Sequence, residues 1–96
     1  MAELEDLRDK INEIDDRILN LVNRRAKIAL KAGEEKSRKG TTDHFHIPHR
    51  EREIIDRLKD LNKGPFSDSM VEVLFREIFS ASLALERTLR IAYLGP

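Results

Sequence analysis

The chain has 96 residues, which is enough for one small domain and too few for two independent hydrophobic cores. Its 18 Lys and Arg residues balance 18 Asp and Glu residues, so no overall charge attracts nucleic acid or an anionic membrane. There is no cysteine, which excludes disulfides and thiolate metal sites. No apolar run approaches the roughly 18 residues that span a bilayer, and the N-terminus is acidic, unlike a signal peptide. We therefore expect a cytoplasmic protein that binds anions only at a local site.

The first part of the chain carries a narrow hydrophobic seam. Its members recur every three or four residues, as on one face of an α-helix: Leu4, Leu7, Ile11, Ile14, Ile18, Leu21 and Ile28. The first cluster of helix-breaking residues is RKGTTD, so the pattern predicts a helix from about residue 3 to about residue 38. Such a helix is on the order of 50 Å long, whereas a compact domain of this size has a radius of gyration near roughly 13 Å. We expect a second copy to cover the overhanging seam, in an intertwined homodimer.

Two shorter helices are predicted in the rest of the chain. Residues 39–47 read as a loop, and Pro48 suits the first turn of a helix over about 48–62, where its missing N–H is not needed. Ser67 or Asp68 can cap a third helix, which continues through about Leu89. The predicted fold class is all-α, with one long, one short and one medium helix. The last six residues, IAYLGP, predict a short strand, which is either a frayed tail or the start of another domain.

A charged residue interrupts the seam of the first helix. Arg25 occupies a position where an aliphatic side chain is expected, and Lys36 follows eleven residues on, so both emerge from nearly the same face. Between them lie the small residues Ala29, Ala32 and Gly33. Two cations over a strip of small side chains describe a recess able to take an anion. The alternative is that Arg25 only fixes helix register or extends into solvent at an interface edge.

The third helix shows a similar interruption. Phe75, Phe79, Ser82 and Glu86 follow one line along it at spacings of four, three and four residues, so an apolar stripe becomes polar. An inward-facing serine and glutamate need partners. The alternative is that Glu86 is solvated or paired with Arg90.

Two other groups of polar residues carry weaker signals. Arg50 and Glu51 are expected in the first turn of the second helix, although alternating charges usually mark a solvated face. His44, His46 and His49 match no zinc spacing and have no acidic or cysteine cluster beside them, so we expect no metal and no cofactor. The sequence contains no glycine-rich phosphate loop, nucleophile elbow or catalytic triad. An enzyme of this sequence would act without a covalent nucleophile.

Taken together, the segments LRDKINEIDDRILNLVNRRAKIALKAGEEK, PHRERE and FREIFSASLALE resemble the all-helical chorismate mutases over about residues 4–90. The resemblance implies an enzyme of phenylalanine biosynthesis that converts chorismate to prephenate by a pericyclic rearrangement. No covalent intermediate, metal or cofactor is implied. The family's fold implies a homodimer of three-helix chains whose long first helices cross between subunits.

The resemblance also assigns roles to the interrupting residues. Arg25 should bind one substrate carboxylate as a bidentate fork, and Arg8 should bind the other in the partner subunit's site. Lys36 should donate to the breaking ether oxygen, which Glu86 should also face. The predicted catalytic residues are Lys36, Glu86 and Arg25. The residues predicted to bind substrate are Arg8, Arg25, Lys36, Arg50, Glu51, Ser82 and Glu86.

The remaining roles concern the second and third helices. Glu51 should accept a hydrogen bond from the substrate hydroxyl, Arg50 should add positive field, and Ser82 should help hold a carboxylate. Glu86 can donate to the ether oxygen only when protonated, so activity should rise as pH falls unless burial keeps this carboxyl protonated. Ile47 stands where the family often has an aspartate, so only its backbone N–H could reach the substrate.

The closing RIAYLGP resembles the first strand of a prephenate dehydratase domain. We therefore expect a chorismate mutase domain over residues 1–90 and the truncated start of a dehydratase-like domain at residues 91–96. The alternative to an enzyme is a non-catalytic helical dimerisation or regulatory module of a shikimate-pathway enzyme. Loss of chorismate on adding the chain distinguishes the two.

Overall fold

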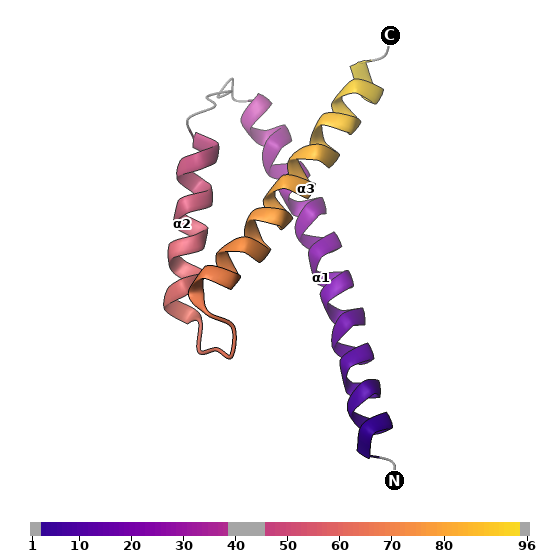
Figure 1. The fold of residues 1–96 in the computed structure, drawn as a ribbon. Coiled ribbons are helices and arrows are strands. Elements are labelled where there is room, and N and C mark those ends of the chain that lie inside the picture. Colours follow the sequence, from indigo (N-terminus) through magenta and orange to yellow (C-terminus); the bar gives the residue numbers. More distant parts are fainter. Residues whose placement is uncertain (1–2, 39–45, 95–96) are drawn as a thin grey trace. The chain divides into compact units, whose positions relative to one another are not determined.

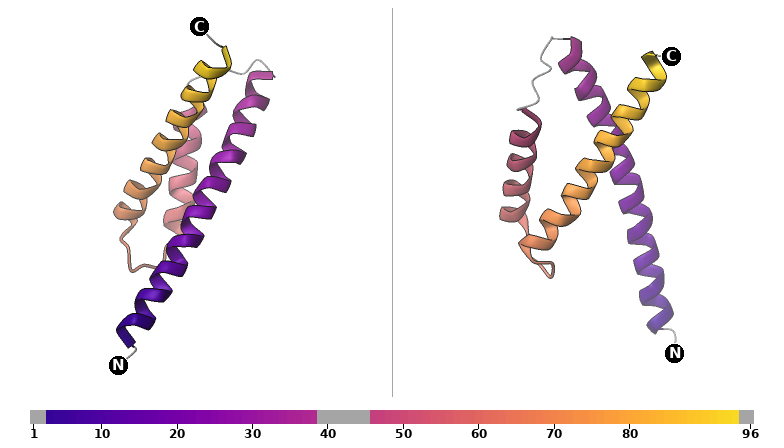
Figure 2. Two further views of the ribbon diagram at one scale, coloured as in Figure 1. Left: turned by 90° about the vertical axis from the view of Figure 1, so that its right-hand side faces the viewer. Right: turned by 45° about the horizontal axis from the view of Figure 1, so that its top comes forward.

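The computed structural model describes residues 3–38 and 46–94, which form three helices (Figures 1 and 2). They are α1 (Glu3–Arg38), α2 (His46–Leu61) and α3 (Asp68–Leu94). The predicted all-α class and the order of long, short and medium helices are confirmed, although α3 is longer than expected. The chain divides into two units, residues 1–34 and residues 35–96, with the boundary inside α1. None of the described helices is long and apolar enough to cross a membrane.

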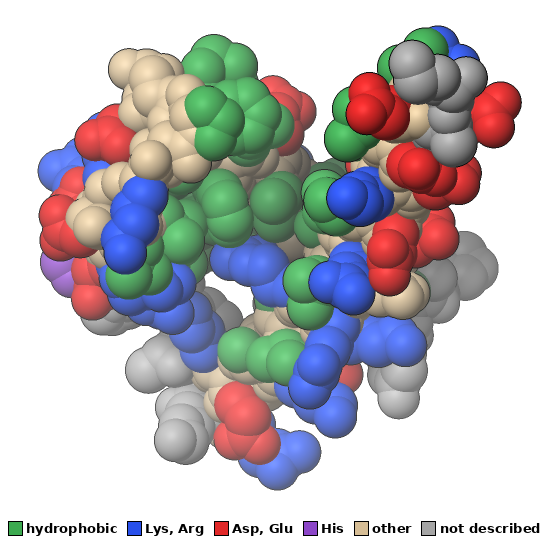
Figure 3. All heavy atoms as spheres, turned by 90° about the horizontal axis from the view of Figure 1, so that it is seen from below, with side chains coloured by type: hydrophobic (Ala, Val, Ile, Leu, Met, Phe, Trp, Pro, Cys, Tyr) green, Lys and Arg blue, Asp and Glu red, His purple; other side chains and the backbone are tan. Residues whose placement is uncertain are grey.

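Helix α1 has the predicted bounds and a charge distribution that suits its dipole. Acidic residues lie in its first turn and the basic Lys36 and Arg38 in its last, where each sign is favourable. The polar contacts along it are local, such as Arg17 Nη2 to Glu13 Oε1 at 3.5 Å and Asn23 Nδ2 donating to the Leu19 carbonyl at 3.1 Å. The seven seam side chains are between 51% and 60% exposed, and apolar side chains are visible at the surface in Figure 3. The described residues of this unit, 3–34, therefore leave the seam open.

Helices α2 and α3 form a small core of their own. Ile54, Ile55 and Phe79 are buried, and Leu58 and Phe75 pack against them. The rings of Phe75 and Phe79 meet edge to face, with centroids 6.4 Å apart and planes at 60°, an arrangement that suits the aromatic quadrupole. The two helices are closest near their shared turn and separate toward the N-terminal end of α2 and the C-terminal end of α3 (Figures 1 and 2).

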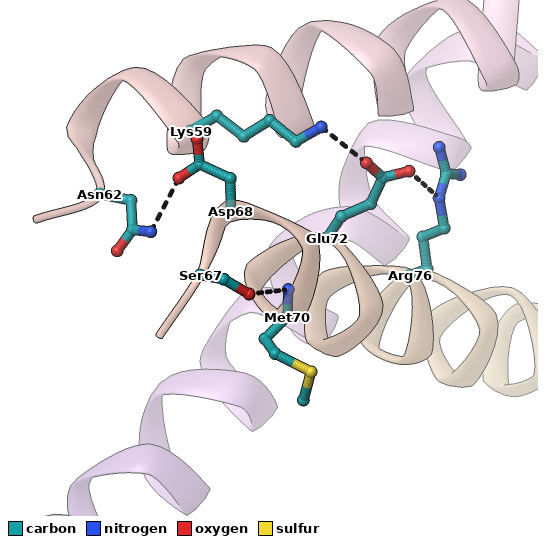
Figure 4. Close-up of polar contacts among 7 residues, drawn as sticks. All are labelled: Lys59, Asn62, Ser67, Asp68, Met70, Glu72 and Arg76. Atoms are coloured by element: carbon teal, nitrogen blue, oxygen red, sulfur yellow. Dashed lines mark hydrogen bonds and ion pairs between the residues drawn. The ribbon is translucent and has the colours of Figure 1, made fainter. Parts of the chain in front are cut away.

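The turn between α2 and α3 is organised by one asparagine. Asn62 Nδ2 donates to the Phe66 carbonyl at 2.8 Å and to Asp68 Oδ1 at 2.9 Å, while its Oδ1 accepts from the Gly64 N–H at 3.0 Å. Gly64 has a φ of 79°, which only glycine adopts without strain. Ser67 caps α3, because its Oγ accepts from the Met70 N–H at 3.2 Å (Figure 4). Of the two predicted capping residues, the structure therefore selects Ser67.

One predicted helix start shifts slightly and one predicted element is wrong. Helix α2 begins at His46, two residues before the expected start near 48, and Pro48 lies in its first turn as predicted. Residues 91–94 belong to α3 and form no strand. The sequence has no glycine or proline between Gly64–Pro65 and Gly95–Pro96, so nothing ends α3 before Leu94, and extending a formed helix outweighs the strand preference of Ile91 and Tyr93. The predicted loop at residues 39–45 lies outside the described residues.

Candidate active site

The predicted site residues of α1 fall in both units. Arg8 and Arg25 belong to residues 1–34, whereas Lys36 lies in the last turn of α1 and belongs to residues 35–96. Arg25 is half-buried, and Arg8 and Lys36 are exposed. Lys36 adds its charge at the C-terminal end of the helix, where the dipole favours a cation. Arg25 is thus the most shielded from water of these three cations.

On α2 the expected position of the charged pair needs correction. Arg50 and Glu51 are the fifth and sixth residues of α2, because the helix begins at His46, and they lie in its second turn rather than its first. The unpaired N–H groups at the start of α2 therefore belong to the residues before them. Glu51 is half-buried while Arg50 is exposed. This difference in exposure fits direct contact of Glu51 with a bound ligand and a longer-range electrostatic effect of Arg50.

On α3 the polar end of the apolar stripe lies where the spacing predicts it. Phe79 is buried at the α2 contact, and Ser82 and Glu86 follow it along the same face, each half-buried. A hydroxyl and a carboxyl one turn apart can both donate and accept hydrogen bonds, the carboxyl donating only when protonated. Together with Lys36 and Glu51, they give residues 35–96 four polar side chains suited to a small polar ligand. The proposed pairing of Glu86 with Arg90 concerns a side chain that lies outside the description.

The histidines form no metal cluster within the described part of the chain. His49 lies on the surface of α2 with its Nε2 3.6 Å from Glu53 Oε1, and His44 and the side chain of His46 lie outside the description. No group of three or more possible metal ligands occurs among the described residues. Those residues therefore give no reason to assign a metal to the site.

A charged cluster joins α2 to α3, and the sequence analysis missed it (Figure 4). Lys59 Nζ lies 2.8 Å from Glu72 Oε1, and Arg76 Nε lies 2.9 Å from Glu72 Oε2. The hydrogen bond from Lys59, with the one from Arg76, holds the pKa of Glu72 below its usual range, and the hydrogen bond to Glu72 raises the pKa of Lys59. The Glu72–Arg76 pair has the spacing of a helical ion pair and could have been found. The Lys59 contact could not, because it depends on how α2 packs on α3.

Comparison with known proteins identifies the family. The model of chorismate mutase type II matches residues 7–87. The chain belongs to the chorismate mutase type II family. The predicted family is thereby confirmed.

Individual relatives agree with this assignment. A bifunctional chorismate mutase/prephenate dehydratase of Aquifex aeolicus is 45% identical over all of this chain, and the chain spans 27% of that protein. A chorismate mutase of Methanocaldococcus jannaschii is 32% identical over 91% of this chain and 87% of its own length. The solved structure of chorismate mutase (form II) from Thermus thermophilus is 33% identical, with a TM-score of 0.79, and covers 88% of this chain and 94% of the other. The chain therefore spans about a quarter of the bifunctional relative and nearly all of the shorter one.

Proposed function

We propose that this chain converts chorismate to prephenate in aromatic amino acid biosynthesis. The observation that carries the proposal is the family match over residues 7–87, together with a relative named chorismate mutase of which the chain covers 87%. That relative is scarcely longer than this chain, so the matched region is sufficient in length for a mutase. We also propose that the reaction takes place in the cytoplasm.

The reaction is a [3,3] rearrangement in which a carbon–oxygen ether bond breaks as a carbon–carbon bond forms. It needs no nucleophile and no obligatory proton transfer. The protein has to hold the dicarboxylate in a compact conformer and stabilise the charge that builds on the ether oxygen. Half-buried Arg25 binds one carboxylate as a fork, and Lys36 donates to the ether oxygen. Glu86 donates to the same oxygen when it is protonated.

The other side chains complete the substrate contacts. Glu51, half-buried on α2, accepts from the substrate hydroxyl, and Ser82 on α3 helps to hold a carboxylate. Arg50 is exposed and contributes positive field. The backbone N–H of Ile47, now within the first turn of α2, has no acceptor inside the helix and suits an anionic ligand.

The active enzyme in this proposal is a homodimer. Seam side chains that are more than half exposed in the single chain would be buried by the long helix of a second copy. Arg8, on the exposed N-terminal part of α1, then supplies the second carboxylate contact in the partner subunit's site. The dimer is supported by the length of the exposed seam, which is greater than a stable monomer normally leaves in water.

The bifunctional relatives support a second proposal about the natural protein. They are several times as long as this chain, and their names include prephenate dehydratase. We infer that residues 1–90 are the mutase domain and that residues 91–96 lead into a dehydratase-like domain. The helical end of α3 would then be the connection between the two, and prephenate would pass from the first activity to the second.

The test is loss of chorismate absorbance with appearance of prephenate, measured for the wild type, Arg25→Met and Arg24→Met. Arg24 is exposed and adjacent, so its substitution changes the same charge by the same chemistry away from the site. We expect Arg25→Met to lower kcat/KM by at least about 100-fold, because each charge-assisted hydrogen bond contributes roughly 1.5–3 kcal/mol and the fork makes two. Arg24→Met should stay within about twofold of the wild type. A folded, dimeric wild type that leaves chorismate unchanged would favour the non-catalytic module.

A further inference from the structure

The cluster of Lys59, Glu72 and Arg76 lies where α2 and α3 meet, away from the proposed substrate contacts. Lys59 is two residues before the end of α2, and Glu72 is in the first turns of α3. Each oxygen of the Glu72 carboxylate has its own donor, Lys59 Nζ at 2.8 Å and Arg76 Nε at 2.9 Å. Arg76, one turn further along α3, fixes the rotamer of Glu72 and so directs the other oxygen toward α2 (Figure 4). The cluster is therefore a directional bridge between two helices.

The bridge differs from other ion pairs of the chain in burial and in span. The Lys59 and Glu72 side chains are 34% and 31% exposed. The pairs Arg17–Glu13 and His49–Glu53 each lie within one helix, with side chains more than half exposed. Pairs of the latter kind do little more than support a helix. A less hydrated pair across two helices can set how the helices are placed.

The apolar contact between α2 and α3 is too small to fix their geometry alone. Only Ile54, Ile55 and Phe79 are buried among the described residues, and apolar contacts are not directional. A small core of this kind tolerates sliding or rotation that a short hydrogen bond between the two helices, Lys59 to Glu72, restricts. Lys59 and Glu72 thus supply the directional restraint that the core lacks.

The residues proposed to contact substrate lie far along the helices from the Lys59–Glu72 pair. A small rotation of one helix at this pair therefore moves them by a large distance. Glu51 lies eight residues before Lys59, about 12 Å along α2, and Glu86 lies fourteen residues after Glu72, about 21 Å along α3. The two helices separate in that direction (Figure 1). A rotation of about 10° at the bridge would move the backbone at Glu86 by about 4 Å, given its distance along the helix. Displacements of even about 1 Å at reacting groups lower rates strongly.

We propose that Glu72, held by Lys59 and Arg76, is a positioning residue that sets the separation between Glu51 on α2 and Ser82 and Glu86 on α3 for catalysis. This inference rests on the proposed mutase function. Glu72 touches no substrate in this account. It acts through the placement of the two helices, so its loss should lower kcat more than it raises KM, since transition-state contacts need the closer geometry.

The experiment compares Lys59→Met, Lys59→Arg and Lys63→Met in the dimeric protein, by chorismate kinetics at a temperature well below unfolding. Lys63 is an exposed residue in the turn after α2, so Lys63→Met makes the same change in side chain and charge without touching the bridge. We expect Lys59→Met to lower kcat at least tenfold with a smaller change in KM. Lys59→Arg should keep at least half of the wild-type kcat because it retains a donor, and Lys63→Met should match the wild type.

A second readout keeps the inference separate from the proposed function. Backbone amide chemical shifts of residues 50–52 and 82–86 should change in Lys59→Met and stay unchanged in Lys63→Met, whether or not chorismate is consumed. An inactive wild type whose Lys59→Met variant shows these shifts would overturn the mutase proposal and leave the bridge as a helix-positioning device. An active wild type whose Lys59→Met variant keeps full kcat, or loses no more than Lys63→Met does, would overturn the positioning role alone.

Discussion

The two units of the chain bury their apolar side chains differently. Residues 35–96 close a small core between α2 and α3, with Ile55 only 2% exposed and a polar bridge across the helices. The described residues of the other unit, 3–34, form a single helix whose seam side chains are all more than half exposed. Apolar residues three or four positions apart form both the seam of α1 and the faces of α2 and α3 that meet in the core. Periodicity therefore predicts which side chains share a face, and the exposure of the seam supports the proposed homodimer.

The largest expected effect is at the seam of α1. Ile11→Asp places a carboxylate from each protomer in the proposed dimer interface, and an unpaired buried charge costs roughly 3 kcal/mol or more. We expect the dimer to dissociate and kcat/KM to fall by more than about 100-fold, because Arg8 can no longer reach the partner subunit's site. Sedimentation velocity and chorismate kinetics measure the two effects. Asn12→Asp adds the same side chain off the seam and should leave both unchanged. A wild type that is monomeric and active would contradict the proposal.

The second test concerns the core of the α2–α3 unit. Ile55→Ala removes a buried side chain, and such changes cost about 2–5 kcal/mol in unfolding free energy, partly through the cavity that they leave. Leu61→Ala, on the same helix at 62% exposure, should cost less than about 0.5 kcal/mol. Urea unfolding at a single protein concentration measures both values, since a dimer's stability depends on concentration. Equal losses would mean that Leu61 is covered in the assembled protein.

A structural feature of this chain can be predicted from the sequence when it depends only on residues of one continuous segment. The bounds of α1, the capping serine and the line from Phe79 through Ser82 to Glu86 all follow from spacing within a single segment, and the structure agrees with them. The strand predicted over residues 91–96 is wrong for residues 91–94, which belong to α3. The prediction rests on the residues' own preference, whereas a helix already formed continues until a breaker stops it.

Features that depend on packing between segments are harder to predict. Lys59 and Glu72 lie thirteen residues apart on different helices, and no spacing rule connects them. Periodicity marks Arg25 and Glu86 as interruptions of apolar stripes, but taken alone it favours solvation or helix register over a binding role. The family match over residues 7–87 supports a functional interpretation and is the basis of the roles proposed for both residues.

A third prediction asks whether the polar end of α3 contributes to catalysis. A Glu86 carboxylate cannot donate to the ether oxygen and would repel the charge that develops there, whereas glutamine donates at any pH. The ratio of kcat/KM for Glu86→Gln to that for the wild type should therefore rise with pH, by at most about tenfold, since one such hydrogen bond contributes about 1.5 kcal/mol. Glu77→Gln, at an exposed position of the same helix, should keep the wild-type profile. Profiles of identical shape for Glu86→Gln and the wild type would exclude the role.

The smallest expected effect is the pH dependence of stability that Lys59 and Glu72 give to the α2–α3 unit. The pKa of Glu72 is lowered in the folded chain, chiefly by the hydrogen bond from Lys59, so its contribution is present above the ordinary glutamate pKa and is lost as pH falls through the lower folded value. The pKa of Lys59 is raised, chiefly by the hydrogen bond to Glu72, so its contribution is present below the ordinary lysine pKa and is lost as pH rises through the higher folded value.

The difference in unfolding free energy between wild type and Glu72→Gln should thus be greatest near neutral pH and shrink toward both extremes. It should also shrink in about 1 M salt, because both side chains remain about a third exposed and are screened. Glu77→Gln serves again as the exposed control, and a Glu72→Gln difference that is constant with pH would mean that packing, and not charge, joins the two helices at this point.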